Sequence, residues 1–503
     1  MTRISVPAAT IVAAAITLSL LLALPARTIT TAYINDVLIF LDGAQRVAFG
    51  QMPNRDFHTA LGPLVYYLPA VGLWLSGRMG GALPVGMGVL ILVLTPVLAY
   101  VVTSRLRPVL GVTFALFLLL ILATPVNLGD PLSSLSFAMF YNRIGWFALG
   151  LLAILHLEPT SGGKAIPWLD AGAAALLVLI TIYTKITYAP VALAFVLLSL
   201  FNSRQRFSAA VAIGLIAACG VLVELVWGGT AGHVNDLLAT AKVSGDRSLR
   251  AIVQAGLNNL PDLLVAAVLA VWALFCRPRL QDLLFYGLCF GGGVLILSQN
   301  AHSWGIITLF AAAAVAGETI IRSGSARALS GAALLFLLLA LPPIARHTIA
   351  FVTHSALAFA DFGAPLPLPR FQEVRFGRLW SPGDNGFSEL YIGTFAEGAA
   401  MLEQRKPAPE QVLVLDFANP FSAGLNLAPP TGDLSWMHWG RNISAAHHPK
   451  PEQLFAGAAV VMIPKIGINS AQLSEIYEPY LSANWQLVRN TRTWKLFVPR
   501  TTP

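Results

Sequence analysis

Long apolar runs recur from the N-terminal region to about Ile344, separated by short polar loops. Each run is long enough to cross roughly 30 Å of hydrocarbon as an α-helix. The runs are continuously apolar and do not alternate with polar residues, which favours helices over the strands of a membrane barrel. The pattern therefore predicts a polytopic α-helical membrane protein with about 11–13 membrane-spanning helices.

The basic loops orient these helices, because Lys and Arg collect in short loops on the cytoplasmic side. Counting the aromatic run 63–77 as a full span would place Arg105 and Arg107 outside, so we expect an interfacial helix there, on the outer face. The N-terminus is then cytoplasmic and the C-terminus lies outside. The expected spans are 6–26, 82–104, 109–126, 132–157, 168–184, 186–201, 207–228, 262–276, 280–298, 304–321 and 329–344.

The first apolar run has two interpretations. Its end at Leu24–Ala26 resembles a signal-peptidase site, so the run could be a signal peptide. We expect an uncleaved span instead, because many spans follow it. In either case Tyr33 emerges on the outer face.

The composition changes after Pro343, where the chain becomes polar and rich in Pro, Gly and aromatic residues. We therefore expect a transmembrane catalytic domain over 1–345, whose first outer loop, 28–80, carries the active site, and a small α/β domain outside the membrane over 346–503. Hydrophobic periodicity in the second part predicts strands and a helix. They are strands at 411–417 and 458–465, a helix at 471–481 and a hairpin at 485–499.

Composition and charge exclude an ordinary soluble domain. Hydrophobic residues make up 56% of the chain and charged residues only 11%, against about a quarter charged in soluble domains. The basic loops account for the net charge of +8, so no nucleic-acid partner is expected. Cys219, Cys276 and Cys289 lie in or beside apolar runs, which argues against a disulfide framework.

The first outer loop concentrates acidic residues that are scarce elsewhere in the membrane part. Asp36 follows the first run at the expected boundary between membrane and water. A carboxylate at that depth can accept a proton from an acceptor hydroxyl or amine while a sugar leaves a lipid-linked phosphate. Asp36 is therefore the candidate general base. The alternative is a solvated carboxylate that caps an amphipathic helix over 36–49.

A second polar group, Asp56 and His58, comes just before the interfacial helix. Asp56 could be a second catalytic carboxylate that flanks one cleft together with Asp36. Asp36, Asp56 and His58 could also hold a divalent metal, although their spacing has no ligand signature, so no metal or other cofactor is assigned. Asp42 is expected to lie off the face of Asp36 and to be solvated.

Further polar residues are expected at the outer ends of the spans. Lys185 stands between two apolar runs, and a cation there should face a cavity or a ligand such as a lipid phosphate; the alternative is a snorkelling anchor at the interface. Arg143 is similarly placed and could hold a second phosphate oxygen. Gln299, Asn300 and His302 belong to a short outer turn and either bind the donor or simply complete the turn.

These residues together resemble the GT-C class of integral-membrane glycosyltransferases, especially its protein O-mannosyltransferase and aminoarabinose-transferase branch. The similarity lies in IND at 34–36, in DFHTALGPLVYYL at 56–68, in TK at 184–185 and in the soluble C-terminal domain. The resemblance implies that Asp36 is the catalytic base, that Asp56 and His58 line the donor or acceptor site, and that Lys185 lies near the donor phosphate. The chain has Gly62–Pro63 where members often have Pro-Pro or Lys-Pro.

The predicted function is glycosyl transfer on the outer face of the membrane. The donor is a sugar linked to polyprenyl phosphate, and the acceptor is a glycan, a lipid such as lipid A, or a protein. Two alternatives remain, a transporter or flippase of lipid-linked glycans and a non-catalytic scaffold. The Ala-, Leu- and Arg-rich composition without a eukaryotic retention signal indicates a multi-pass protein of a bacterial inner membrane, with the C-terminal domain in the periplasm.

Overall fold

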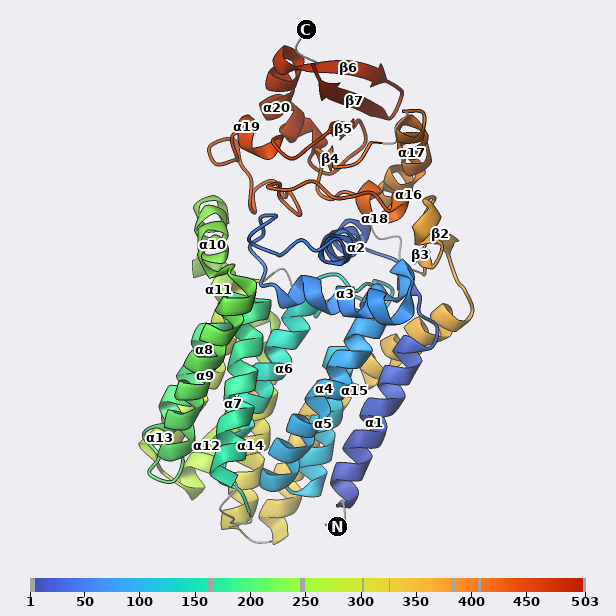
Figure 1. Ribbon diagram of the computed structural model, residues 1–503. Helices are drawn as coiled ribbons and strands as arrows, with labels where there is room; N and C mark the ends of the chain where they lie inside the picture. The colour runs from blue at the N-terminus through green and yellow to red at the C-terminus, as the bar shows by residue number, and fades with distance from the viewer. Residues whose placement is uncertain are drawn as a thin grey trace.

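A bundle of long helices carries a smaller mixed domain on one of its ends, as Figure 1 shows for the computed structural model of the chain. Two helices of the first outer loop, α2 (Ile34–Ala48) and α3 (Leu64–Ser76), lie between the bundle and this domain. The structure describes residues 5–160, 166–244, 249–300, 303–324, 326–380, 385–405 and 409–500.

Every predicted span corresponds to a helix of the bundle. The bundle consists of α1 (Val6–Ala23), α4 (Ala82–Arg105), α5 (Pro108–Ala123), α6 (Phe140–Ile154), α7 (Ile166–Thr184), α8 (Ala189–Ser199), α9 (Arg206–Trp227), α12 (Leu260–Cys276), α13 (Leu280–Ser298), α14 (Ile307–Ser323) and α15 (Ala326–Phe359).

Not all of these helices are long enough to cross a membrane by themselves. Six helices pass a test of length and apolar composition among the described residues, and a bent pair, α11 (Leu249–Asn258) with α12, makes up to seven. Other bundle helices are shorter; α6, for example, has 15 residues, about 22 Å at 1.5 Å per residue. The polytopic helical fold is thus confirmed, with a smaller number of full-length spans than expected.

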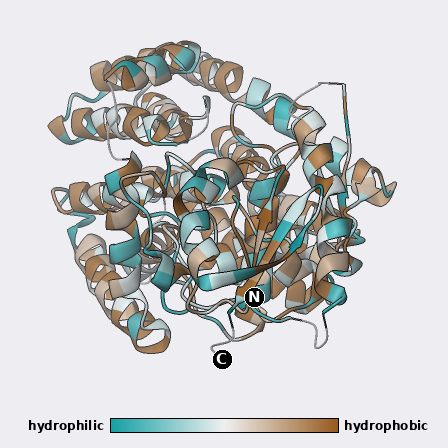
Figure 2. Cartoon of the chain, turned by 90° about the horizontal axis from the view of Figure 1, so that it is seen from above, coloured by the Kyte–Doolittle hydropathy of each residue, from teal (hydrophilic) through white to brown (hydrophobic). Residues whose placement is uncertain are grey.

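The centre of the bundle is built on small residues. In α14 every residue from Ile307 to Ile321 is buried, including the run Ala311–Ala314. Small side chains let neighbouring backbones approach closely, which is how helices associate where lipid offers no hydrophobic gain. Seen from above, the C-terminal domain shows hydrophilic loops and a partly hydrophilic hairpin around hydrophobic inner strands (Figure 2).

The aromatic run 63–77 forms a separate helix at one end of the bundle, and its place at a membrane interface stays a prediction. Helix α3 crosses the end of the bundle instead of running through it (Figure 1). A Cβ at Gly72 would lie 2.0 Å from the carbonyl oxygen of Ala82, and a Cβ at Gly86 would lie 2.5 Å from that of Leu68. These two glycines therefore permit the close crossing of α3 and α4.

The expected span 132–157 begins later than predicted. Residues 132–139 are irregular, and helix α6 starts only at Phe140. The reason is a set of bonds to the first outer loop: the backbone N–H of Thr31 donates to Leu135 O at 2.8 Å, and Leu135 N–H donates to Thr31 Oγ1 at 2.8 Å. Because the backbone N–H and C=O of Leu135 bond to Thr31, they are not available for helical hydrogen bonds, and the segment 132–139 stays outside α6.

Two other boundaries differ from the expectation. The outer segment 229–260, expected as a loop, contains the helices α10 (Thr230–Ser244) and α11. The last span, expected to end at Ile344, continues as α15 through Pro342 and Pro343 to Phe359. Helix α15 thus crosses the expected division between residues 345 and 346, and that division stays a prediction.

The C-terminal domain has the strands and the helix that the sequence predicts. Its four-stranded sheet has the order β4-β5-β7-β6, in which β4 and β5 are parallel and β5, β7 and β6 are antiparallel neighbours. Its elements are α16 (Asn385–Gly393), α17 (Phe395–Glu403), β4 (Val412–Val414), α18 (Phe421–Leu425), α19 (Pro451–Leu454), β5 (Val460–Pro464), α20 (Ser470–Asn484), β6 (Trp485–Asn490) and β7 (Trp494–Pro499).

A second sheet joins the first outer loop to the segment that follows α15. Strand β1 (Thr28–Thr30) in the first outer loop pairs in parallel with β3 (Val374–Phe376), and β2 (Ala364–Pro365) pairs with β3 in antiparallel fashion. The first outer loop is therefore held from above by residues that come more than three hundred positions later.

Candidate active site

Asp36 lies in the first turn of α2, between the bundle and the C-terminal domain. The N-cap of this helix is Tyr33, whose backbone is left-handed (φ 55°), so Asp36 is not the cap that one interpretation of the sequence proposed. The carboxylate is half-buried, and its removal from water raises its pKa to about 7, against a smaller lowering by a backbone hydrogen bond. Asp36 is thus a carboxylate that can take up a proton near neutral pH.

Tyr141, at the start of α6, interacts with Lys185 and with the charge of Asp36. The charges of Asp36 and of Arg441, from the C-terminal domain, both act on the Tyr141 hydroxyl. The Lys185 ammonium lies 4.9 Å from the centroid of the Tyr141 ring, a cation–π distance. The Asp36 carboxylate therefore acts on the same tyrosine whose ring contacts Lys185.

Two asparagine amides hold Lys185 in place. Its Nζ donates to Asn142 Oδ1 at 3.0 Å and to Asn300 Oδ1. Asn300 is itself fixed, because its Nδ2 donates to Ile296 O at 2.8 Å. Amide oxygens orient the ammonium without neutralising it, so its positive charge is retained.

The other two residues expected in the outer turn are Gln299 and His302. Gln299 is the C-cap of α13, and His302 lies outside the described residues. Of the three residues predicted for this turn, the structure brings Asn300 to Lys185.

Arg143 is buried in α6 with its guanidinium unsatisfied. It is 1% exposed, and Nε, Nη1 and Nη2 all have no hydrogen-bond partner. Its guanidinium carbon lies 6.0 Å from the centroid of Phe137, whose ring also contacts the buried His354 edge-on. A buried guanidinium without partners is costly unless an anion accompanies it.

Asp56 and His58 have other partners than the sequence suggested. Asp56 Oδ2 accepts a hydrogen bond from Met52 N at 2.7 Å, which closes a turn. His58 Nδ1 lies 2.8 Å from Asp236 Oδ1 of α10, and this hydrogen bond is the main reason that the pKa of His58 is raised. No hydrogen bond or ion pair between described residues joins Asp36 to either of them.

The possible metal site is not assembled in this arrangement. In the described part of the chain, no group of three or more His, Cys, Asp and Glu side chains has a geometry that could hold a metal ion. Asp36, Asp56 and His58, all of which are described, therefore do not form a ligand set. Asp236 instead holds the loop 50–62 in place, because it accepts hydrogen bonds from Asn54 Nδ2 at 2.8 Å and from Thr59 N at 3.0 Å.

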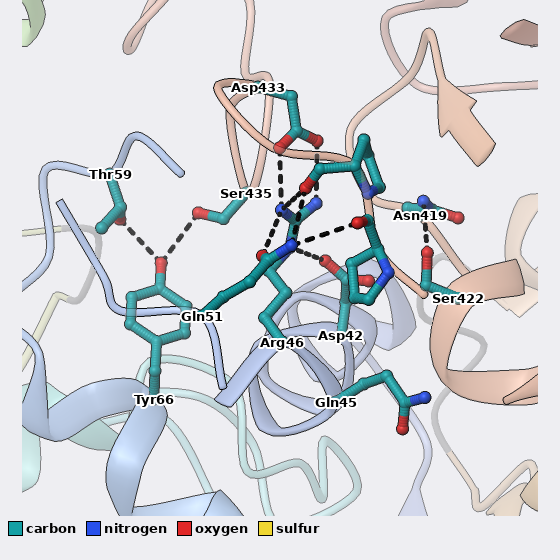
Figure 3. Close-up of polar contacts among 12 residues, drawn as sticks. Asp42, Gln45, Arg46, Gln51, Thr59, Tyr66, Asn419, Ser422, Asp433 and Ser435 are labelled. Atoms are coloured by element: carbon teal, nitrogen blue, oxygen red, sulfur yellow. Dashed lines mark hydrogen bonds and ion pairs between the residues drawn. The ribbon is translucent and has the colours of Figure 1, made fainter. Parts of the chain in front are cut away.

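The expectation that Asp42 is solvated is wrong. Asp42 is fully buried and accepts from Arg46 Nε at 2.7 Å. Arg46 also reaches Asp433 of the C-terminal domain through two bonds, Nη1–Oδ1 at 2.7 Å and Nη2–Oδ2 at 2.8 Å. Figure 3 shows Arg46 lying between the two carboxylates, and we call these three residues the buried triad.

Two further contacts hold the loop beneath the C-terminal domain. The Tyr66 hydroxyl lies 2.7 Å from Thr59 Oγ1 and 2.9 Å from Ser435 Oγ (Figure 3). At Gly62, a Cβ would lie 2.1 Å from the carbonyl oxygen of Tyr183, and the Gly62 N–H donates to Thr184 O at 3.0 Å. The entry to α3 thus packs directly on the turn that carries Lys185.

Several residues of the site escaped the sequence analysis. Tyr141 and Asn142 immediately precede Arg143, and this polar start of an apolar helix was a signal for all three. Arg441, Asp236 and Asp433 lie far from the first loop in sequence, and no local pattern connects them to it.

No protein-family model matches the chain, and no curated protein matches its sequence. Two solved structures match over nearly its whole length. A crystal structure of ArnT from Cupriavidus metallidurans in the apo state is 12% identical, covers 97% of this chain and 96% of its own, and has a TM-score of 0.47. A cryo-EM structure of the arabinofuranosyltransferase AftD from Mycobacteria is 13% identical, covers 98% of this chain and 40% of its own, and has a TM-score of 0.42. At these identities no residue role carries over from either structure.

Proposed function

We propose that the chain is a membrane glycosyltransferase that moves a sugar from a polyprenyl-phosphate donor to an acceptor on the outer face of the membrane. The observation that carries the proposal is that Asp36, a half-buried carboxylate with a pKa of about 7, acts electrostatically on Tyr141, whose ring contacts Lys185. A base works best when its pKa lies near the working pH.

Each charged group then has a part in an inverting displacement. Asp36 accepts the proton of the acceptor hydroxyl or amine as that atom bonds to the anomeric carbon. The bond from this carbon to the phosphate oxygen breaks, and the phosphate leaves with the electron pair. Lys185 stabilises the negative charge that develops on the phosphate.

Arg143 is the second candidate for the phosphate. Arg143 follows Asn142 in α6, and Asn142 accepts a hydrogen bond from Lys185. The three guanidinium nitrogens of Arg143 have no hydrogen-bond partner. A phosphate oxygen would supply the anionic partner that the buried guanidinium lacks, and Arg binds phosphate in a planar, two-pronged manner.

A reconstituted transfer assay tests the proposal. Purified protein in liposomes is given a panel of radiolabelled polyprenyl-phosphate sugars, with membrane extract as the source of acceptors. We expect label to pass from one donor to an extractable acceptor. Movement of intact labelled lipid across the bilayer, without transfer from any donor, would instead identify a flippase of lipid-linked glycans.

A further inference from the structure

The end of the bundle opposite Asp36 contains a polar cavity of about 480 Å³. Its walls come from the segment after α6, from the connections α8–α9 and α12–α13, and from the end of α14. Four arginines line it, against one carboxylate among the described residues, Glu158. The arginines are Arg204, Arg277, Arg279 and Arg322.

Two of the arginines form the frame of the cavity. Arg322 donates to Glu318 Oε1 at 2.9 Å, to Glu158 O at 3.1 Å and to Arg105 O at 2.6 Å. Arg204 pairs with the carboxylate of Glu158. These bonds fix the wall where α6, α9 and α14 meet.

The other two arginines keep binding capacity for a ligand. The Nε of Arg277 is shielded from water and has no hydrogen-bond partner; it lies 3.7 Å from Asp282 Oδ2, which has none either. The second oxygen of Asp282 is 2.9 Å from His156 Nε2. Arg279 is exposed and has no ion-pair partner within the described ranges.

We propose that this cavity binds a phosphate-bearing anion. Guanidinium groups match the geometry of phosphate oxygens, and charge-assisted bonds to phosphate are among the strongest hydrogen bonds in proteins. The volume falls in the range of about 300–1,000 Å³ that is usual for small-ligand sites. Arginines that served only to orient the helices would not need to line one shared cavity.

A second cavity, of about 30 Å³, is too small for an acyl chain. It is lined by residues of α6 to α9, among them Leu152, Asp170 and Phe195. Gln205 is fixed in the wall, because its Nε2 donates to Leu155 O at 2.8 Å. Basic pockets at the cytoplasmic ends of helices bind the headgroups of anionic phospholipids, so a lipid is one source of the phosphate group that the polar cavity would bind.

The ligand chemistry has two possible sources, an anionic lipid headgroup and a soluble phosphorylated compound. The site lies at the end that the basic loops assign to the cytoplasm. The inference does not rest on glycosyl transfer, so it stands or falls separately from the proposed function.

Native mass spectrometry of the purified full chain tests the site. Delipidated protein is titrated with dioleoyl-phosphatidylglycerol, with dioleoyl-phosphatidylcholine, and with inorganic phosphate and glycerol phosphate as soluble competitors. The variants are Arg279→Gln, whose exposed side chain can change without disturbing the fold, and Arg277→Gln/Arg279→Gln. The matched control is Arg206→Gln, an exposed arginine at the same end that bonds to Leu200 O and does not line the cavity.

We expect binding of the anionic probe to weaken about tenfold or more in the double variant, and to stay unchanged in Arg206→Gln. If the soluble phosphates cannot displace phosphatidylglycerol, the site binds a lipid headgroup. If they displace it, and their own binding also depends on Arg277 and Arg279, the site binds a soluble ligand. Equal binding by wild type and double variant for every phosphate probe, or an equal loss in Arg206→Gln, would overturn the proposal.

Discussion

At the scale of single residues, the position of Asp36 was predictable and its environment was not. The sequence places a carboxylate just beyond the first span, but the removal of Asp36 from water depends on how the folded chain packs around it. The same limit explains the error at Asp42, since Arg46, which pairs with Asp42, also pairs with Asp433, and Asp433 comes almost four hundred residues later. Lys185 was identified because a lone cation between apolar runs is visible locally.

Replacing Asp36 by Asn is expected to stabilise the protein above neutral pH. The folded-state pKa of about 7 exceeds the unfolded value of roughly 3.9, so the folded form binds the proton more tightly. The stability that Asp36 provides is therefore complete below about pH 4 and is lost as the pH rises through 7.

Thermal unfolding of wild type and Asp36→Asn at pH 8 and pH 5 measures this effect. We expect the variant to be more stable by on the order of 2 kcal/mol at pH 8, after allowance for partial solvent screening, with a smaller difference at pH 5. A variant that is less stable than wild type at pH 8 would show that the Asp36 charge is well solvated.

At the scale of elements, apolar periodicity located the helices but not the contacts between them. The segment 132–139 reads as part of a span, yet its backbone bonds to Thr31. The helices α10 and α11 lie in a polar stretch without a long apolar run. Gly62, which departs from the pattern of the resembled family, is explained only by the backbone of Tyr183 and Thr184 against which it packs.

Substitution of Gly62 by Ala is expected to impair the site while leaving the bundle intact. The added methyl would lie 2.1 Å from the carbonyl oxygen of Tyr183, so the turn that carries Lys185 must shift. We expect the transfer rate to fall by about tenfold or more, since small displacements of positioning groups have large effects on rate.

The matched control is Gly172→Ala in α7, where an added Cβ meets no atom within 4 Å. Transfer rates and melting temperatures of both variants are compared in the same liposomes. Unchanged transfer by Gly62→Ala would mean that the Lys185 turn is not a precise part of the site.

At the scale of the whole molecule, the C-terminal domain and the first outer loop form one assembly. Parallel pairing of β1 with β3 and the buried triad Asp42–Arg46–Asp433 both connect them. The strands and helix of this domain were predictable from local alternation. Its attachment to the first outer loop was not, because attachment depends on pairs that are hundreds of residues apart.

Replacing Arg46 by Met is expected to loosen this attachment. The change leaves Asp42 and Asp433 buried without their cation, and breaking a buried ion pair typically costs about 3–5 kcal/mol. Hydrogen exchange should rise in α2 and around residues 429–435, and the melting temperature should fall.

The exposed pair Arg378–Glu389 provides the control, since solvent-exposed ion pairs contribute little to stability. Arg378→Met should leave exchange and melting unchanged. If Arg46→Met also left hydrogen exchange and the melting temperature unchanged, the buried triad would not hold the domain on the loop.

The central claim is that Asp36 is the base, and comparison of two isosteric variants tests it most directly. Transfer from the active donor is measured in liposomes for wild type, Asp36→Asn and Asp56→Asn, with expression and melting checked for each. We predict that Asp36→Asn lowers the rate by about 10²–10⁴-fold, the usual contribution of a general base, and that Asp56→Asn keeps most of it, because Asp56 closes a turn through Met52 N. Transfer that survives in Asp36→Asn and disappears in Asp56→Asn would contradict the account and make Asp56 the catalytic carboxylate.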